Sequence, residues 1–246
     1  MLHHSPGLYL NTFGYRGAAG YVPLNGTEPG IIFGVNFNNE NVDVTGNHTV
    51  ANNVLYTANK SYDGQRHAAE LPGNSASRIF TNAGTAHQIA TAAAVSYGGM
   101  FLVNAATSDD NATHMSSSTT SGATNQNYGF RYKKVNANYQ RVPGAVDTVY
   151  AGAALEDWVH IVVVEPAGRA TALWYINGIF QETTAPVATG QPNGTDEIWI
   201  GEQAGVAGTN AAGWCSDVFI SNLELNAAQV LQFATNAFGG TPPAAP

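Results

Sequence analysis

A run of short β-type segments in the second half of the chain constrains the fold most strongly. Residues 158–164 are almost all apolar and rich in Val, and residues 170–176 have a similar character after a turn at 165–168. Asn177 and Gly178 follow as a two-residue hairpin signal, because both central positions of a type I′ turn need positive φ. Residues 158–181 therefore predict a meander of three antiparallel strands.

The rest of the chain shows a related pattern, and helical periodicity is nearly absent. Short β-branched and aromatic segments alternate with Asn, Gly, Asp, Pro and Ser, which is typical of an all-β sandwich. The other expected strands are 30–37, 49–57, 78–81, 87–94, 99–103, 128–135, 197–201 and 217–225. Asn226 is placed to cap a short helix over 227–234. The predicted fold is an all-β, antiparallel two-sheet β-sandwich (jelly roll) with one short C-terminal helix.

Three segments are expected outside the core of a single domain that spans 1–238. Residues 1–30 form an N-terminal arm. Residues 105–127 are polar and of low complexity, so they predict an exposed, mobile loop. The tail 239–246 contains three prolines and is expected to run as an extended segment.

Strand alternation also predicts which side chains face the shared interior of the sandwich. Each sheet buries one face against the other. We expect Trp158, Leu173 or its neighbour Trp174, and Phe219 to point inward. Cys215 is the chain's single cysteine, so an intramolecular disulfide is excluded and the residue is interpreted as a buried small apolar side chain.

Charge excludes one class of partner. The formal net charge is -8, and the nine Lys and Arg form no run longer than Lys133 and Lys134. A protein that binds the phosphate backbone of nucleic acid needs a basic surface, so nucleic acid is not an expected partner. No apolar stretch approaches the ~20 residues that cross a bilayer, so membrane insertion is not expected either.

An ordered set of motifs covers roughly residues 155–235. It comprises Trp158 with His160, then 173–178, 198–201, 217–220 and 225–230. This order resembles the laminin-G-like domains of the concanavalin-A-like lectin and glucanase superfamily. The resemblance implies a concanavalin-A-like sandwich. It implies no single activity, because that fold carries hydrolases, lectins and adhesion modules.

Catalysis is not expected. Hydrolases of this superfamily carry carboxylates two residues apart on one strand, where they act as nucleophile and general acid. Glu197 takes the first of these positions, but Trp199 and Gly201 occupy the next two, and Glu202 faces the other side by parity. His160 is interpreted as a packed strand residue rather than a catalytic base.

Exposed aromatic side chains are the candidates for glycan binding, because the apolar face of a sugar stacks on a flat ring. Trp214, in the loop 204–216, and Tyr132 and Tyr139 are best placed to be exposed. Trp199 is ambiguous between core and surface, and we keep it as a fourth candidate. Burial on the sandwich is the alternative for all four.

One cofactor is considered. Asp109, Asp110 and Asn111 offer the hard oxygen ligands that calcium prefers. These three residues form the candidate calcium site, with ordinary solvated loop carboxylates as the alternative. No other cofactor is expected.

Two functions stay open. The first is a non-catalytic structural or binding protein on the surface of a virus (phage) particle, such as a capsid decoration, fibre or tail protein made in the host cytoplasm. A start without a secretory leader, a single Cys and an Asn- and Thr-rich composition with few charged residues favour it. Its expected partners are virion proteins such as the major capsid protein, cell-surface glycans and further copies of itself. The alternative is an extracellular lectin or glycoside hydrolase of the same superfamily.

Overall fold

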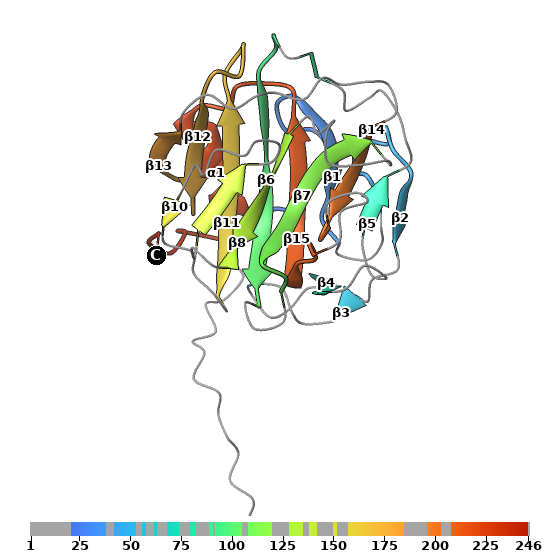
Figure 1. The fold of residues 1–246 in the computed structure, drawn as a ribbon. Coiled ribbons are helices and arrows are strands. Elements are labelled where there is room, and N and C mark those ends of the chain that lie inside the picture. Colours follow the sequence, from blue (N-terminus) through green and yellow to red (C-terminus); the bar gives the residue numbers. More distant parts are fainter. Residues whose placement is uncertain are drawn as a thin grey trace, which may run out of the picture.

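The protein is a β-sandwich with one helix on its outside (Figure 1). The computed structural model describes residues 21–37, 42–52, 56–57, 62, 68–73, 79–81, 89–90, 92–104, 108–119, 128–134, 138–141, 150–151, 157–184, 196–202 and 208–245. Within these ranges every strand pairing is antiparallel apart from one isolated bridge. The predicted fold class is confirmed.

The first sheet has eight strands in the described part of the chain. Their order across the sheet is β13 (Ile179–Thr184), β12 (Ala172–Ile176), β11 (Trp158–Glu165), β6 (Val95–Val103), β15 (Ala212–Ser221), β4 (Ala68–Pro72) and β3 (Tyr56–Thr57), and β1 (Ile31–Val35) also pairs with β15. The second sheet has seven described strands. Their order is β10 (Tyr150–Ala151), β9 (Asn138–Arg141), β8 (Tyr128–Lys133), β7 (Asn111–Thr119), β14 (Asp196–Ile200), β5 (Ile79–Thr81) and β2 (Val50–Asn52).

The predicted meander is present as β11, β12 and β13. Asn177 and Gly178 both have positive φ, at 51° and 80°, which confirms the turn that their sequence indicates. The Asn177 side chain also accepts a hydrogen bond from the His160 N–H at 3.0 Å. The turn is therefore tied to the strand on the far side of the meander.

The inner faces of the two sheets meet in an apolar interior. Phe101 of β6, Phe130 of β8 and Trp174 of β12 are fully buried there, and the Phe130 ring lies edge-on to both of the others. Trp174 confirms the expectation for Leu173 or its neighbour. Cys215 is buried in the same cluster, as predicted, and burial raises the pKa of its thiol.

A charged link joins the sheets inside this interior. Glu165 of β11 accepts hydrogen bonds from the Arg141 guanidinium of β9, one of them at 2.6 Å, and from the Tyr97 hydroxyl. Arg169 lies 3.9 Å from the same carboxylate. Burial and the charge of Glu165 raise the pKa of Tyr97, so Tyr97 stays a neutral donor. A buried charge needs such pairing to be tolerated.

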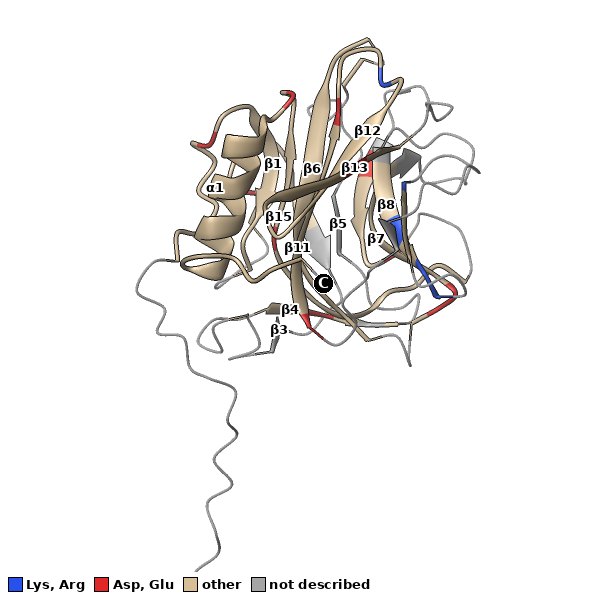
Figure 2. Cartoon of the chain, turned by 90° about the vertical axis from the view of Figure 1, so that its left-hand side faces the viewer, with Lys and Arg blue, Asp and Glu red and all other residues tan. Residues whose placement is uncertain are grey.

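Helix α1 (Ala227–Phe238) covers part of the outer face of the eight-stranded sheet, as Figure 2 shows. Its start matches the prediction, since Asn226 and Gln229 form a reciprocal capping box, and Gly239 ends it in the left-handed conformation. Residues 21–28 lie beside it, with the Val22 N–H donating to Asn236 O. No helix in the described ranges is long and apolar enough to cross a bilayer.

Two of the inward predictions were wrong. Trp158 and Phe219 lie on the outer face, where Phe219 stacks on Phe233 of α1 at 4.5 Å. A bulge causes the change at Phe219: the register of β15 against β6 shifts between Ser216 and Phe219, and Asp217 has a φ of 50°. A bulge shifts the alternation of faces along its strand.

The prediction of an exposed loop over 105–127 was also wrong for the part that the structure describes. Residues 111–119 form β7, which pairs with β8 on one side and β14 on the other. Ser116 and Ser117 are fully buried. The physical reason is that this strand is stabilised by backbone ladders on both sides, so its composition can be polar. Residues 105–107 and 120–127 lie outside the described residues.

Other boundaries differ more modestly. The predicted strand 49–57 is two short strands in different sheets, β2 and β3. The described residues of 87–94 form no strand. In the tail, Ala244 O accepts a hydrogen bond from the Asn177 side chain at 3.2 Å, and Ala245 packs against the core cluster.

Candidate glycan-binding site

A cross-strand row of side chains on the eight-stranded sheet is the strongest candidate site. Trp158 of β11 and Trp214 of β15 both pair with Leu102 of β6, which runs between them. Glu70 of β4 pairs with Trp214 on its other side. The order Trp158, Leu102, Trp214, Glu70 therefore runs across four adjacent strands, and we call it the aromatic row.

Strand parity places the aromatic row on the outer face. The residues next to its members, Val159, Phe101, Cys215 and Ala69, are all buried in the interior cluster. Successive side chains of a strand point to opposite faces. The members of the row consequently project away from the interior, onto the face that α1 shares.

The aromatic row lies at the C-terminal end of α1. Trp158 and Tyr62 pack against a small cluster that contains Met100, Ala237 and Phe238, and Tyr62 meets Phe238 edge-on at 4.6 Å. In Figure 2, α1 covers one end of this face, and β3 and β4 lie at the other end. The C-terminal end of the helix therefore packs against the Trp158 end of the row.

Partial exposure separates the aromatic row from its surroundings. Trp158, Leu102, Trp214 and Glu70 are each partly exposed. Asp157, which precedes Trp158, is exposed. Two tryptophans and one acidic residue are thus partly exposed on one face, with the Trp214 indole nitrogen itself buried. Indoles can stack on the apolar faces of sugars, and carboxylates accept hydrogen bonds from sugar hydroxyls.

The sequence identified only one member of this row. Trp214 was predicted as a glycan contact; the structure places it in the aromatic row, and its contact with a glycan stays a prediction. Trp158 was assigned to the core because its strand is apolar on both faces, which hides the direction of each side chain. No sequence signal marks Leu102 or Glu70, since their contribution comes from the strand register.

The predicted exposure of Tyr132 and Tyr139 was wrong. Tyr132 is 1% exposed and Tyr139 0%, and their rings meet at 5.8 Å between the sheets. Both residues share the inner face with Phe130 and Arg141, to which strand parity assigns them. They contribute to the core.

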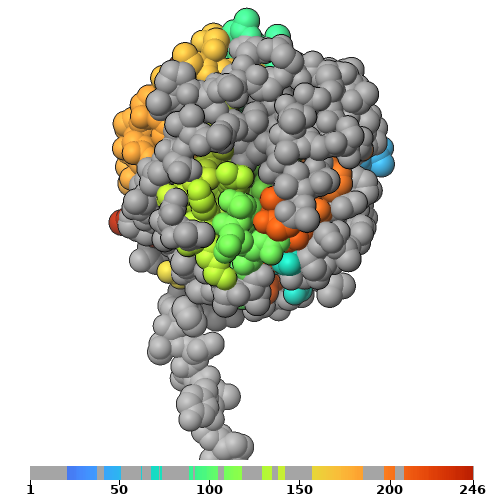
Figure 3. Space-filling view, in the orientation of Figure 1, coloured from blue at the N-terminus to red at the C-terminus, as the bar shows by residue number. Residues whose placement is uncertain are grey.

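Trp199 lies on the outer face of the other sheet. Its indole N–H donates to Glu197 at 3.0 Å, and the side chain is 5% exposed. Ser116 of β7 pairs with it across the strands. Figure 3 looks onto this face and shows atoms of β7, β8 and β14 side by side in green, yellow-green and orange. The burial of Trp199 makes it a weaker stacking surface than Trp158 or Trp214.

The residues of the candidate calcium site have structural contacts. Asp109 accepts hydrogen bonds from the backbone and side chain of Asn210 at 2.9 and 2.8 Å, Asp110 O accepts from the Lys134 N–H, and Asn111 begins β7. In the described ranges, no group of three or more His, Cys, Asp or Glu could hold a metal ion. Calcium binding stays a prediction.

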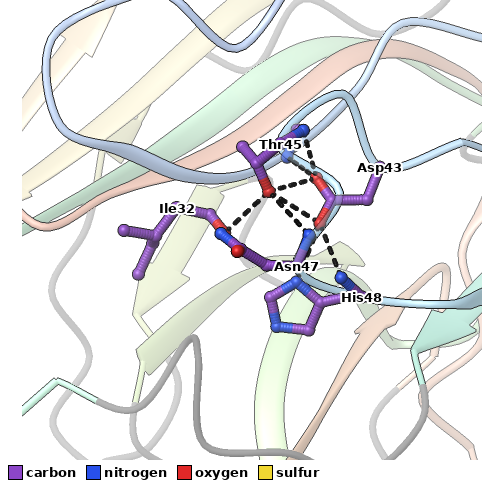
Figure 4. Close-up of polar contacts among 6 residues, drawn as sticks. Ile32, Asp43, Thr45, Asn47 and His48 are labelled. Carbon is purple, nitrogen blue, oxygen red and sulfur yellow. Dashed lines mark hydrogen bonds and ion pairs between the residues drawn. The ribbon is translucent and has the colours of Figure 1, made fainter.

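Asp43 organises a turn rather than a site. Figure 4 shows its carboxylate between Thr45 and His48, which donate to it at 2.8 and 2.9 Å. Burial alone would raise the pKa of Asp43, but hydrogen bonds from His48, Thr45 and Gly34 hold it below its usual value. A carboxylate with this many local donors stabilises its own loop.

Histidine chemistry is not favoured. His160 is 1% exposed and lies on the outer face beneath α1, where burial lowers its pKa to about 3. The pocket that it lines with Asp217 and Phe233 has room for only about one water molecule. His160 is thus a packed strand residue, as predicted.

Comparison with known proteins gives structural matches only. No protein-family model matches the sequence, and no curated protein matches it. The binding domain of Paraclostridial Mosquitocidal Protein 1 superimposes with a TM-score of 0.61 at 14% identity, over 86% of this chain and 55% of that one. Trypanosoma rangeli sialidase gives 0.60 at 12% identity, over 86% of this chain and 34% of the sialidase. This chain therefore spans about half and a third of those two structures.

One similar structure is matched over nearly its whole length. Domain 4 of an extracellular arabinanase from Geobacillus stearothermophilus, solved in complex with arabinotriose, superimposes with a TM-score of 0.58 at 17% identity. The match covers 84% of this chain and 99% of the arabinanase domain. At these identities the similarity shows the fold alone, a two-sheet antiparallel β-sandwich.

Proposed function

We propose that this chain is a non-catalytic glycan-binding module and that the aromatic row is its binding surface. The observation that carries the proposal is that Trp158 and Trp214 are partly exposed in one row on one face of a rigid sheet. Stacked aromatic contacts are each worth about 0.5–1.5 kcal/mol beyond the area they bury. Two such contacts would together add about 1–3 kcal/mol to the free energy of binding a sugar chain.

The structural matches support a binding role without identifying the ligand. The arabinanase domain that this chain matches over its whole length was solved with arabinotriose. A fold can carry unrelated activities, so the argument for this chain rests on its own side chains. Arabinotriose is nevertheless a reasonable first probe beside a wider glycan array.

The test is glycan binding by the intact chain and by single-site variants. Trp158→Ala and Trp214→Ala should each weaken binding about tenfold or more, because each removes a stacking contact. Trp199→Phe is the matched control, since it changes an indole on the opposite sheet and should leave affinity unchanged. Near-UV circular dichroism verifies that each variant is folded. The absence of glycan binding by the unmodified chain, or a loss confined to Trp199→Phe, would refute the proposal.

The non-catalytic part of the proposal has its own test. The Glu197 carboxylate accepts a hydrogen bond from the Trp199 indole N–H at 3.0 Å, and Trp199 and Gly201 occupy the strand positions where hydrolases of the concanavalin-A-like superfamily carry their other carboxylates. Incubation with every glycan that the array identifies should release no new reducing ends. Release of sugar that disappears in Glu197→Gln would instead support the glycoside hydrolase alternative.

Three further expectations stay predictions from the sequence. They are location on a virus particle, the major capsid protein as a partner, and assembly into a homo-oligomer. The aromatic row adds only that a glycan-binding surface would suit a protein displayed on a particle. Mass spectrometry of purified particles tests the location, and the mass of the purified chain in solution tests the oligomeric state. A monomeric chain that is missing from particles would contradict them.

A further inference from the structure

We propose that the aromatic row takes an uncharged oligosaccharide of at least three units, bound across the strands, rather than a single sugar. This inference rests on the proposed function and specifies its ligand. It follows from three properties of the row: the spacing of its indoles, the rigidity of its support and the sign of the charges beside it.

The spacing comes from the strand order. Trp158 and Trp214 both pair with Leu102, so β11 and β15 lie on opposite sides of β6. Adjacent strands are ~4.8 Å apart, which places the two indoles roughly 9.5 Å apart in the direction perpendicular to the strands. One sugar ring cannot stack on both. The indoles therefore contact different sugars of one chain, and Leu102 lies beneath the unit between them.

The support is rigid at this point. A Cβ on Gly213, the neighbour of Trp214, would lie 1.8 Å from Leu102 O, so the backbones of β15 and β6 approach closely there. Gly213 also has a φ of 134°, which disfavours other residues. The stacking positions are thus held by paired strands and need no ordering when a ligand binds. Preorganisation of this kind lowers the cost of association.

Among the residues that the structure describes, the charges beside the row are negative. Glu70 pairs with Trp214 at one end, and Asp157 precedes Trp158 at the other. Within the described ranges, Arg131, Lys133 and Lys134 belong to β8 and the residue after it, in the other sheet (Figure 2, blue), and the remaining two arginines contact Glu165 in the interior. Carboxylates accept hydroxyl hydrogen bonds and repel sulfated or carboxylated sugars. Neutral sugar chains fit this surface.

The experiment compares ligand length. Calorimetric titration uses mono- to pentasaccharides of each neutral series that the array identifies, with a carboxylated or sulfated series in parallel. Affinity should rise on the order of tenfold or more between the mono- and the trisaccharide, because the second indole is engaged through the same chain. In Trp158→Ala and in Trp214→Ala this rise should disappear, and in the double variant the affinity for both ligands should fall further because the remaining stacking contact is lost. Trp199→Phe should keep the rise.

The outcomes separate the two proposals. Binding of no sugar at all defeats the proposed function. A monosaccharide that binds as tightly as its trisaccharide, with both tryptophans still required, defeats this inference alone. Tighter binding of the acidic series by the unmodified chain would contradict the charge argument. Glu70→Gln should narrow the preference for neutral over acidic chains, and an unchanged preference would count against its role.

Discussion

The outer faces of the two sheets differ in chemistry. On the eight-stranded sheet the outward residues include Val162, Val164 and Phe219, all buried under α1 and the segment beside it. On the seven-stranded sheet they include Ser116, beside Trp199, and Gln140, which accepts a hydrogen bond from Arg131 at 3.1 Å. The eight-stranded sheet is thus apolar on both faces where α1 and the segment beside it cover it, and the seven-stranded sheet is apolar only inside.

This difference explains why strands of the eight-stranded sheet could be predicted from the sequence more easily than β7 of the other sheet. A strand covered on both faces is a continuous apolar run, as residues 158–164 are. Strand β7, with the sequence NATHMSSST, carries no apolar alternation because Ser and Thr occupy so much of it. The four predictions that follow test this comparison, from the largest expected effect to the smallest.

The link between the sheets should give the largest effect. Glu165→Gln leaves Arg141 and Arg169 buried without a carboxylate, so the free energy of unfolding should fall by about 3–5 kcal/mol. Urea titration measures the loss. As a control, the double change of Glu165 and Arg141 to Met should cost less than the sum of the two single changes. Additive costs would show that the two charges do not stabilise each other.

Loss of packing between α1 and the outer face of the eight-stranded sheet should have the second-largest effect on stability. Phe233→Ala removes the ring that stacks on Phe219 and should destabilise the protein by about 3 kcal/mol. Ser116→Ala, on the outer face of the other sheet, should cost about 1 kcal/mol or less. Urea midpoints of both variants compare the two faces directly. Equal losses would mean that α1 packs loosely.

Low pH should lower the stability of both the interior and the outer face under α1, because each contains a buried histidine. Burial lowers the pKa of His114, in the interior, to about 4 and that of His160, under α1, to about 3. In the unfolded chain the pKa of histidine is ~6.5, so below that value unfolding takes up protons. Their stabilising contribution is complete above pH ~6.5 and is lost progressively as the pH falls, by about 2 kcal/mol for each histidine at pH 5.

Two measurements check the acid effect. Titration of the imidazole resonances by NMR should leave both rings neutral at pH 5. The difference between the unfolding free energies at pH 7 and at pH 5 should be smaller by about 2 kcal/mol in His114→Gln than in the unmodified chain. His160→Gln should reduce this difference by a similar amount. If His160 alone titrates near its usual value, the outer face is open to solvent and the cover is incomplete.

The helix cap should give the smallest effect. Asn226→Ala removes an acceptor for the Gln229 N–H, at 3.0 Å, and should cost about 1 kcal/mol. Asn226→Asp keeps an acceptor at the same place and should retain most of the stability. Thermal unfolding of the two variants measures the difference. A loss in Asn226→Asp as large as that in Asn226→Ala would rule out the capping contact as its source.

The sequence predicted features that depend on nearby residues. The Asn177 and Gly178 turn, the Asn226 cap and the apolar strands β6, β11 and β12 are all determined within a few residues. Features that depend on distant partners were missed. The polar strand β7 is stabilised by the ladders on both sides, and the direction of Phe219 depends on a bulge at Asp217. The aromatic row brings together residues 70, 102, 158 and 214, and only their register across the sheet makes them a site.

The position of β15 has a consequence for synthesis. This strand pairs with β6 along one edge and with β4 and β1 along the other, so that Ile31 lies opposite Ser221. On the ribosome, β1, β4 and β6 emerge long before the strand that joins them. The nascent chain therefore exposes unpaired strand edges until residues 212–221 have been synthesised, and the sheet can close only after that.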